Sequence, residues 1–161
     1  MKILLTILYS MGMCFLGNAQ ERLSKDSLDY YLSTLDNTSI IIASNHFDKL
    51  GIDEKARRIC QNASEEVVQY LIKNLSNSKR TLICHVILTK NLVLHKPGFR
   101  YEYNYSGQKI VWTTYVYNNL SWIVYEDGRI EVSPNEISKI KKYWSTRKVK
   151  GMLMLHNCTN D

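Results

Sequence analysis

A cysteine and a histidine stand side by side in TLICHVILTK (residues 81–90), within an otherwise apolar stretch. A thiol beside an imidazole is the pairing that a nucleophilic site needs, because the imidazole can remove the proton of the thiol. The apolar pattern predicts a helix, on which adjacent residues point about 100° apart. Cys84 and His85 therefore cannot face each other as nucleophile and base. We interpret Cys84 as a small residue packed at a helix contact, and His85 as the edge of a buried stripe.

The remaining cysteines indicate a disulfide rather than a metal site. Cys60, Cys84 and Cys158 follow the N-terminal segment, and an oxidising compartment permits one disulfide among them. The sequence leaves the three pairings open, and we prefer Cys60–Cys84 because both residues lie in the helical half. Neither a CxxC pair nor the Cys/His spacing of a zinc site is present, so we expect no structural metal.

The sequence also lacks the common motifs of catalysis and cofactor binding. It contains no Gly-rich phosphate loop, no GxSxG elbow and no HExxH pair. We therefore predict a non-enzymatic protein without a cofactor. Two enzyme alternatives stay open. One is a pair of acidic residues from distant segments, which leaves no local pattern. The other is an enzyme that uses His85 with a carboxylate from elsewhere.

The N-terminus, MKILLTILYSMGMCFLGNAQ, has the features of a cleaved secretory signal. Lys2 supplies the positive charge, an apolar run follows over residues 3–16, and small residues precede a cleavage site after Ala19. The apolar run is short for a membrane span, and no later run is longer. We therefore expect residues 1–19 to be removed and the protein to be secreted or periplasmic.

The charge balance restricts the class of partner. The chain has 21 Lys and Arg against 15 Asp and Glu, and its net charge is +6. A basic exported protein is drawn to an anionic glycan or lipid of the envelope, or to a protein, rather than to nucleic acid. The charge can also serve only to keep the protein soluble. Residues 20–161 are enough for a single domain with its own core.

Apolar periodicity predicts that residues 20–96 are mainly helical. An amphipathic helix is expected over residues 21–35, whereas the SIIIAS that follows is too short to assign to a strand or a helix. A second helix, capped by Asn62 or Ser64, precedes a third over residues 79–92. The turn between these two helices is so short that they must pack antiparallel.

This pair, VVQYLIKNLSNSKRTLICHVILTK, resembles a HEAT-type repeat. It has an apolar first helix, a polar turn, and Arg80 opening a second helix with small and branched residues. The resemblance covers this pair alone. The order of a helical pair, an aromatic β segment and a final helix looks like an uncharacterised group of small exported bacterial proteins, and that resemblance implies no known activity.

Over residues 97–133 the apolar period changes from about 3.6 to 2, which predicts β hairpins. Ser133 and Glu136 then form a capping box with proline at the first helical position, and a helix is predicted over residues 134–148. Residues 149–161 are expected to form a tail. The predicted fold class is α+β, with N-terminal helices, a small antiparallel sheet and a C-terminal helix.

Aromatic residues are concentrated in the predicted sheet, and basic residues in the final helix. Odd-numbered tyrosines of a strand share one face, and such a row can stack on sugar rings or anchor a protein partner. The alternative is that this face packs as core beneath the last helix. We predict a contact surface formed by Tyr115, Tyr117, Lys139, Lys142 and Arg147.

These features favour an exported, non-enzymatic binding or interaction protein of the bacterial envelope. The alternative is a periplasmic inhibitor or immunity protein. Such proteins are also small, exported and free of catalytic motifs, so the sequence does not separate the two functions.

Overall fold

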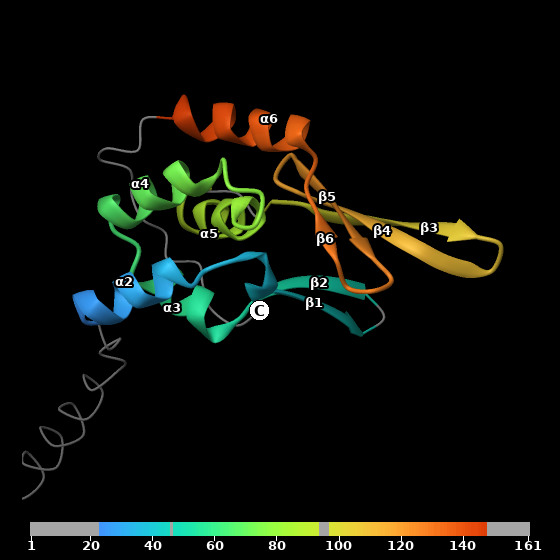
Figure 1. The fold of residues 1–161 in the computed structure, drawn as a ribbon, viewed down its shortest axis with the longest axis horizontal. Coiled ribbons are helices and arrows are strands. Elements are labelled where there is room, and N and C mark those ends of the chain that lie inside the picture. Colours follow the sequence, from blue (N-terminus) through green and yellow to red (C-terminus); the bar gives the residue numbers. More distant parts are fainter. Residues whose placement is uncertain (1–22, 46, 94–96, 148–161) are drawn as a thin grey trace, which may run out of the picture.

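The computed structural model describes residues 23–45, 47–93 and 97–147, and these residues form the predicted α+β fold (Figure 1). The predicted signal peptide and the tail over residues 149–161 lie outside the described residues. Within them, no helix has the length and apolar character needed to cross a membrane. The elements, in chain order, are α2 (Lys25–Ser33), η1 (Asn37–Ser39), β1 (Ile40–Asn45), β2 (Phe47–Ile52), α3 (Glu54–Gln61), α4 (Glu65–Asn74), α5 (Thr81–Leu92), β3 (Phe99–Ser106), β4 (Lys109–Tyr117), β5 (Leu120–Tyr125), β6 (Ile130–Glu131) and α6 (Pro134–Ser145).

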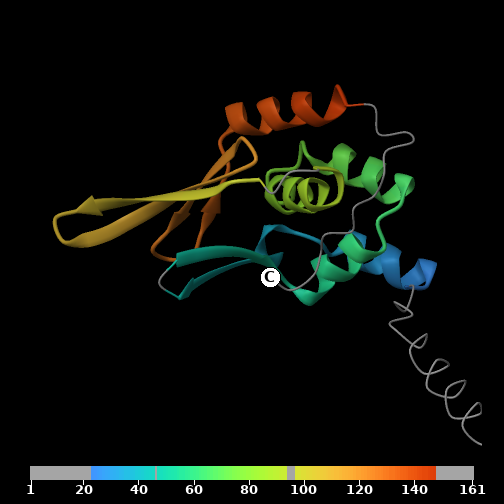
Figure 2. The ribbon, with the colours of Figure 1, turned by 180° about the vertical axis from the view of Figure 1, so that it is seen from behind.

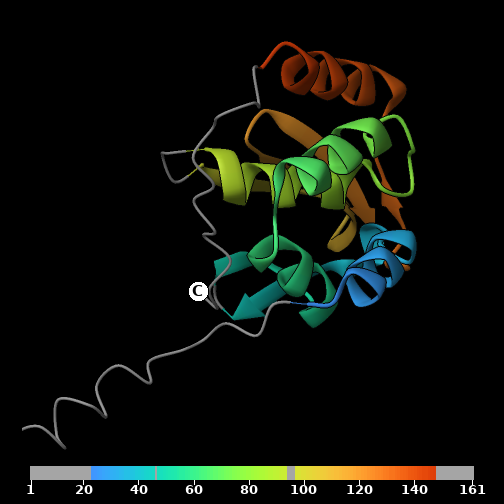
Figure 3. The same cartoon turned by 90° about the vertical axis from the view of Figure 1, so that its left-hand side faces the viewer.

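The helix α5 occupies the centre of the fold. It is apolar on every side, and all of its residues except Lys90 are buried. A helix without a polar face must be covered all round, and α5 contacts α3, α4 and η1. Figures 1 and 3 show α5 in a middle layer, with α6 on one side and α3 on the other. The core therefore forms around α5 rather than between two equal layers.

Short polar residues begin most of the other helices, and two of these caps, Ser64 and Ser133, were predicted from the sequence. Ser24, Asp53, Ser64 and Ser133 each accept a hydrogen bond from a backbone N–H in the first turn. The predicted capping box of α6 is only half formed. The Glu136 carboxylate accepts from the backbone N–H of Ser121 at 2.9 Å, so it ties α6 to β5 instead of returning to its own helix start.

The described residues form two separate antiparallel sheets. β1 and β2 form a hairpin within the segment that was predicted to be mainly helical, which assigns the ambiguous SIIIAS to a strand. The second sheet has the order β3–β4–β5–β6. Its β3–β4 hairpin turns at Gly107, whose φ of +63° is a conformation that glycine adopts without strain. Figures 1 and 2 show this hairpin extending farther from the helices than the other strands.

The first turn of α5 is capped by a residue far away in the sequence. Arg80, which precedes the helix, makes no side-chain capping bond. Instead Asn37 Oδ1 accepts from the backbone N–H groups of Leu82 at 3.1 Å and Ile83 at 3.2 Å, while Asn37 Nδ2 donates to the carbonyl of Ser78 at 2.8 Å. These amides are buried and have no intrahelical partner. Without the Asn37 side chain they would be unsatisfied hydrogen-bond donors, which would destabilise the fold.

Replacing Asn37 tests this long-range cap. We expect Asn37→Ala to lower the free energy of unfolding by about 2 kcal/mol, because two buried amides lose their acceptor. The control is Asn77→Ala, since Asn77 caps the exposed turn before α5 by accepting from the Lys79 N–H at 3.0 Å. Urea denaturation of both variants and the wild type gives the comparison. Equal losses in the two variants would contradict a special role for Asn37.

Candidate binding surface

His85 is a buried link between three elements. Its side chain has no exposed surface. Nε2 lies 3.0 Å from the backbone carbonyl oxygen of Tyr117, so this nitrogen carries the proton and donates, and Nδ1 accepts from Trp144 Nε1–H at 2.9 Å. Burial lowers the pKa of His85 to about 4, which keeps the ring neutral. Both nitrogens are engaged inside the core, and this argues against His85 as the base of the predicted enzyme alternative.

The same burial predicts how stability depends on pH. The ordinary pKa of histidine, 6.5, applies to the unfolded chain, and the pKa in the folded chain is about 4. Below pH 6.5 the His85 side chain binds a proton in the unfolded chain but stays neutral in the folded chain until the pH approaches 4. The contribution of His85 is therefore complete above pH 6.5 and is lost as the pH falls toward 4, by about 3 kcal/mol in total.

Urea denaturation of the wild type and His85→Gln between pH 7.5 and 4.5 measures this contribution. Glutamine can still donate to Tyr117 and accept from Trp144, but it does not titrate. We expect the stability of the variant to fall less steeply over this range than that of the wild type. Carboxylates contribute equally to both proteins, so parallel curves would contradict a depressed pKa at His85.

The cysteines do not pair as the sequence suggested. Cys84 has a free, buried thiol, whereas Cys60 is disulfide-bonded. Every pairing that includes Cys84 is thereby excluded, and the preferred Cys60–Cys84 bond is wrong. Cys60 and Cys84 lie on α3 and α5, which pack against each other. Placing two cysteines on neighbouring helices does not determine whether their side chains point toward each other. Asn91, about two turns after Cys84 on α5, donates to the Cys60 sulfur at 3.2 Å.

Burial makes the Cys84 thiol unreactive, and this is directly testable. Desolvation raises its pKa to about 12, against a smaller opposing effect of Arg80. Since the thiolate is the reactive form, we expect iodoacetamide at pH 8 to leave Cys84 unmodified in the folded protein and to modify it in urea. Peptide mapping by mass spectrometry reports modification at this residue. Rapid labelling without denaturant would contradict its burial.

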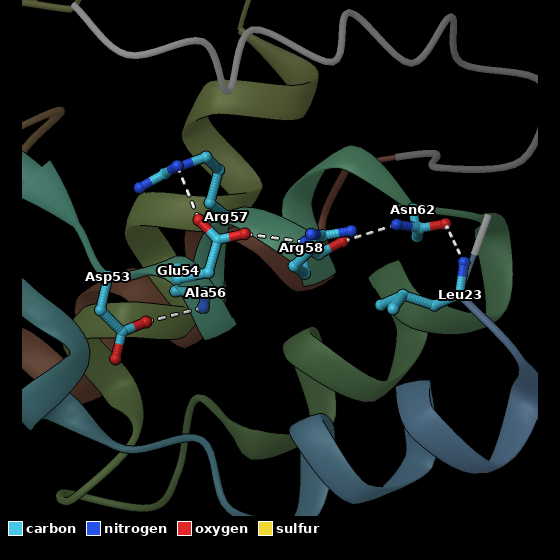
Figure 4. Close-up of polar contacts among 7 residues, drawn as sticks. All are labelled: Leu23, Asp53, Glu54, Ala56, Arg57, Arg58 and Asn62. Atoms are coloured by element: carbon cyan, nitrogen blue, oxygen red, sulfur yellow. Dashed lines mark hydrogen bonds and ion pairs between the residues drawn. The ribbon is translucent and has the colours of Figure 1, made fainter. Parts of the chain in front are cut away.

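The charged side chains of helix α3 pair with one another. The Glu54 carboxylate pairs with the Arg57 guanidinium at 2.6 Å and with Arg58 Nε at 2.8 Å. Figure 4 shows Glu54 between these two side chains. The hydrogen bond from Arg58 is the main cause that lowers the pKa of Glu54. At the other end Asn62 accepts from the Leu23 N–H at 3.1 Å and donates to the Arg58 carbonyl at 2.8 Å. This cluster therefore holds the N-terminal segment against α3.

A depression of about 450 Å³ lies between η1, the turn before α5 and β6. Its lining includes Asp36, Lys79, Arg129 and Glu131. Arg129 pairs with Glu131 at 3.3 Å and also lies 3.9 Å from the ring centre of Tyr125. Hydrogen bonds from Thr38 lower the pKa of Asp36 and keep it ionised. Within the described residues, no group of three His, Cys, Asp or Glu side chains is placed to hold a metal ion.

The aromatic row of the sheet runs from the core to the surface. The ladder register places Tyr101 opposite Tyr115 and Tyr115 opposite Trp122, so these rings share one face. Tyr115 and Trp122 stack with ring centres 5.7 Å apart. From Tyr101 the row continues to Tyr103 at 5.2 Å and from there to Tyr105 at 6.4 Å.

Exposure changes sharply along this row. Tyr115 and Tyr117 are only 6% and 7% exposed, whereas Tyr103 and Tyr105 are 36% and 61% exposed. The predicted contact residues Tyr115 and Tyr117 are therefore core residues, and this part of the prediction is wrong. Period-2 alternation identified the shared face, but it does not reveal how far along the strands the rest of the fold covers that face.

A bulge near the end of the hairpin places aromatic and apolar side chains on both faces. The register shifts between Asn104 and Tyr105, so that Ile110 lies opposite Tyr105 and Trp112 lies opposite Asn104. Ile110 and Trp112 are both exposed. An extra residue in one strand reverses the alternation beyond it. A regular pattern would place Ile110 and Trp112 on one face, and the bulge was not predicted from the sequence.

The basic residues of the predicted surface lie elsewhere. Lys139, Lys142 and Arg147 are exposed on or just after α6. Lys139 pairs with Glu136 at 3.1 Å, and the Arg147 guanidinium lies 4.4 Å from the ring centre of Tyr143. Figure 1 shows α6 running away from the projecting hairpin. The structure therefore separates the basic helix from the exposed tyrosines and does not combine them into one surface.

Comparison with known proteins gave no relative from which to infer a function. No protein-family model, curated protein or solved structure matches the chain. The exposed part of the β3–β4 hairpin, formed by Tyr103, Tyr105, Ile110 and Trp112, is therefore assigned as the candidate binding surface from its geometry alone. We refer to it as the aromatic tip.

Proposed function

We propose that this chain is an exported, non-enzymatic binding protein whose aromatic tip contacts a protein partner. The observation that carries the proposal is the exposure of Tyr103 and Tyr105 on a hairpin that projects from the helices. Large aromatic side chains are enriched among the residues that dominate protein interfaces. The proposed export rests on the N-terminal sequence, and the envelope location follows from it.

The orientation of the rings favours a protein partner over a glycan. The Tyr101 and Tyr103 rings are inclined at 58° to each other, and the Tyr103 and Tyr105 rings at 65°. Consecutive rings therefore do not form one flat platform on which a chain of sugars could stack. Inclined rings leave recesses between them, which side chains of a protein can fill.

The exposed charges of α6 support a second, weaker contact with an anionic glycan or lipid. Lys142 has an exposed side chain, and Lys139 keeps its ammonium group at the surface beside Glu136. A few exposed lysines on one helix also suit a simply solvated surface. Binding to anionic lipid vesicles that is lost at high salt would support this contact.

The alternative function, a periplasmic inhibitor or immunity protein, is favoured by one feature of the tip. Tyr105 and Ile110 are exposed on one face of the hairpin, and Trp112 is exposed on the other. A flat partner covers only one of these faces, whereas a cleft encloses both. Insertion of the tip into the cleft of a target protein is the arrangement that this alternative requires.

Substitution of the two exposed tyrosines tests the proposal. Immobilised residues 20–161 are incubated with an envelope protein extract, an anionic glycan panel and anionic vesicles. We expect a protein to be captured, and its recovery to fall at least about tenfold with Tyr103→Ala/Tyr105→Ala, since aromatic anchors at interfaces are worth 2 kcal/mol or more. Tyr30→Ala is the matched control, because Tyr30 is a 64% exposed tyrosine on α2.

The pattern of losses separates the alternatives. Equal loss with Trp112→Ala favours insertion into a cleft, and no loss favours a partner on the tyrosine face alone. Capture that survives the double substitution, with unchanged circular dichroism and thermal melting, would overturn the proposed role of the tip. Binding to glycans but not to proteins would overturn the choice of partner.

A further inference from the structure

β3 is an edge of the four-stranded sheet. Among the described strands it pairs only with β4, and β2, which contacts it, belongs to the other sheet. Every second residue of an edge strand points its backbone N–H and C=O groups away from the sheet, where another strand can bind them. Figure 2 shows the β3–β4 hairpin reaching beyond the remaining strands. The backbone groups of this edge are one part of a possible interface, and side-chain charge is the other.

Two opposite charges lie close together on this edge. Arg100 and Glu102 are two residues apart, so they share the face of β3 opposite the tyrosines, and both are exposed. Arg100 lies opposite Val116 and Glu102 lies opposite Thr114, so β4 offers neither of them a charged neighbour directly across the ladder. When two identical strands of this kind pair antiparallel, the positive residue of each can lie opposite the negative residue of the other.

We propose that β3 pairs antiparallel with β3 of a second copy of this chain, with Tyr101 opposite the same residue of that copy. In this register Arg100 of each copy lies opposite Glu102 of the other, which gives two cross-strand ion pairs. The neighbouring registers that keep the tyrosines of both copies on one face differ from this one by two residues. They would put Arg100 opposite Arg100, or Glu102 opposite Glu102. Like charges directly opposite each other are destabilising, so charge selects one register among these neighbours.

The bulge and the tyrosines agree with this register. Regular pairing with β4 ends between Asn104 and Tyr105, and a bulge bends a strand and interrupts further pairing. The proposed register uses residues 99–103, which lie before that point. On the other face it places Tyr101 beside Tyr101 and Phe99 beside Tyr103, and aromatic cross-strand pairs are stabilising. The dimer would thereby join the aromatic rows of two copies through Tyr103, whereas Tyr105, Ile110 and Trp112 of each tip lie beyond the paired residues.

Charge reversal gives a test with its own rescue. Sedimentation velocity of residues 20–161 over a range of concentrations measures the dissociation constant of the dimer. We expect Arg100→Glu and Glu102→Arg each to weaken the wild-type dimer by about tenfold or more, because two attractive pairs become repulsive. An equimolar mixture of the two variants should dimerise again, and so should the double variant. Lys73→Glu, an exposed charge reversal on α4, is the control.

Each other outcome overturns the proposal. A wild-type protein that stays monomeric at about 1 mM excludes the dimer at concentrations where even weak associations form. A dimer that responds no more to Arg100→Glu than to Lys73→Glu uses another surface. Single variants that weaken the dimer without rescue in the mixture exclude this register. The function of the aromatic tip is tested separately: a monomeric protein that loses its partner with Tyr103→Ala/Tyr105→Ala overturns the dimer and leaves that function standing.

Discussion

The burial of α5 on every side is the constraint on which the rest of the structure depends. A helix with a polar face is oriented by turning that face to solvent. A helix without one has no such preference, so contacts with other elements must determine its orientation. The polar groups that it does carry must find partners inside the core. Most of them do so on different elements: the first amides on Asn37 of η1, Thr89 on Asn118 beyond β4, and the Asn91 amide nitrogen on Cys60 of α3. Each of these contacts fixes one neighbour to the helix. Asn91 Oδ1 is buried without a hydrogen-bond partner among the described residues.

His85 shows why residues that suggest chemistry in the sequence serve structure in this fold. The ring donates to the carbonyl of Tyr117 in β4 and accepts from Trp144 in α6, so one side chain joins the sheet to the last helix. A neutral imidazole is suited to this because it offers one donor and one acceptor on opposite sides. Protonation would replace the acceptor with a second donor facing the indole N–H, and desolvation opposes it as well. The low pKa and the linking role therefore have the same origin.

Local patterns predicted the elements that depend on neighbouring residues. The start of α6 at Ser133, the two helices on either side of the SNS turn, and the shared face of the odd-numbered tyrosines follow from periodicity and capping, and the structure contains all three. Features that depend on distant residues were not predictable in this way. Asn37 caps a helix more than forty residues later, and Glu136 bonds to β5. Whether each tyrosine is exposed or buried depends on which elements cover the sheet.

The aromatic row connects the stability of the core to the geometry of the tip. Phe99, Tyr115 and Trp122 stack within the base of the sheet, and Tyr101 contacts both Tyr115 and Tyr103. The exposed rings of Tyr103 and Tyr105 each contact a ring that is more deeply buried, which restricts their rotamers. Ordering side chains on binding costs about 0.5–1.5 kcal/mol for each rotamer-rich group. Rings that are already ordered avoid much of that cost, so the packing that builds the core would also favour the contact proposed for the tip.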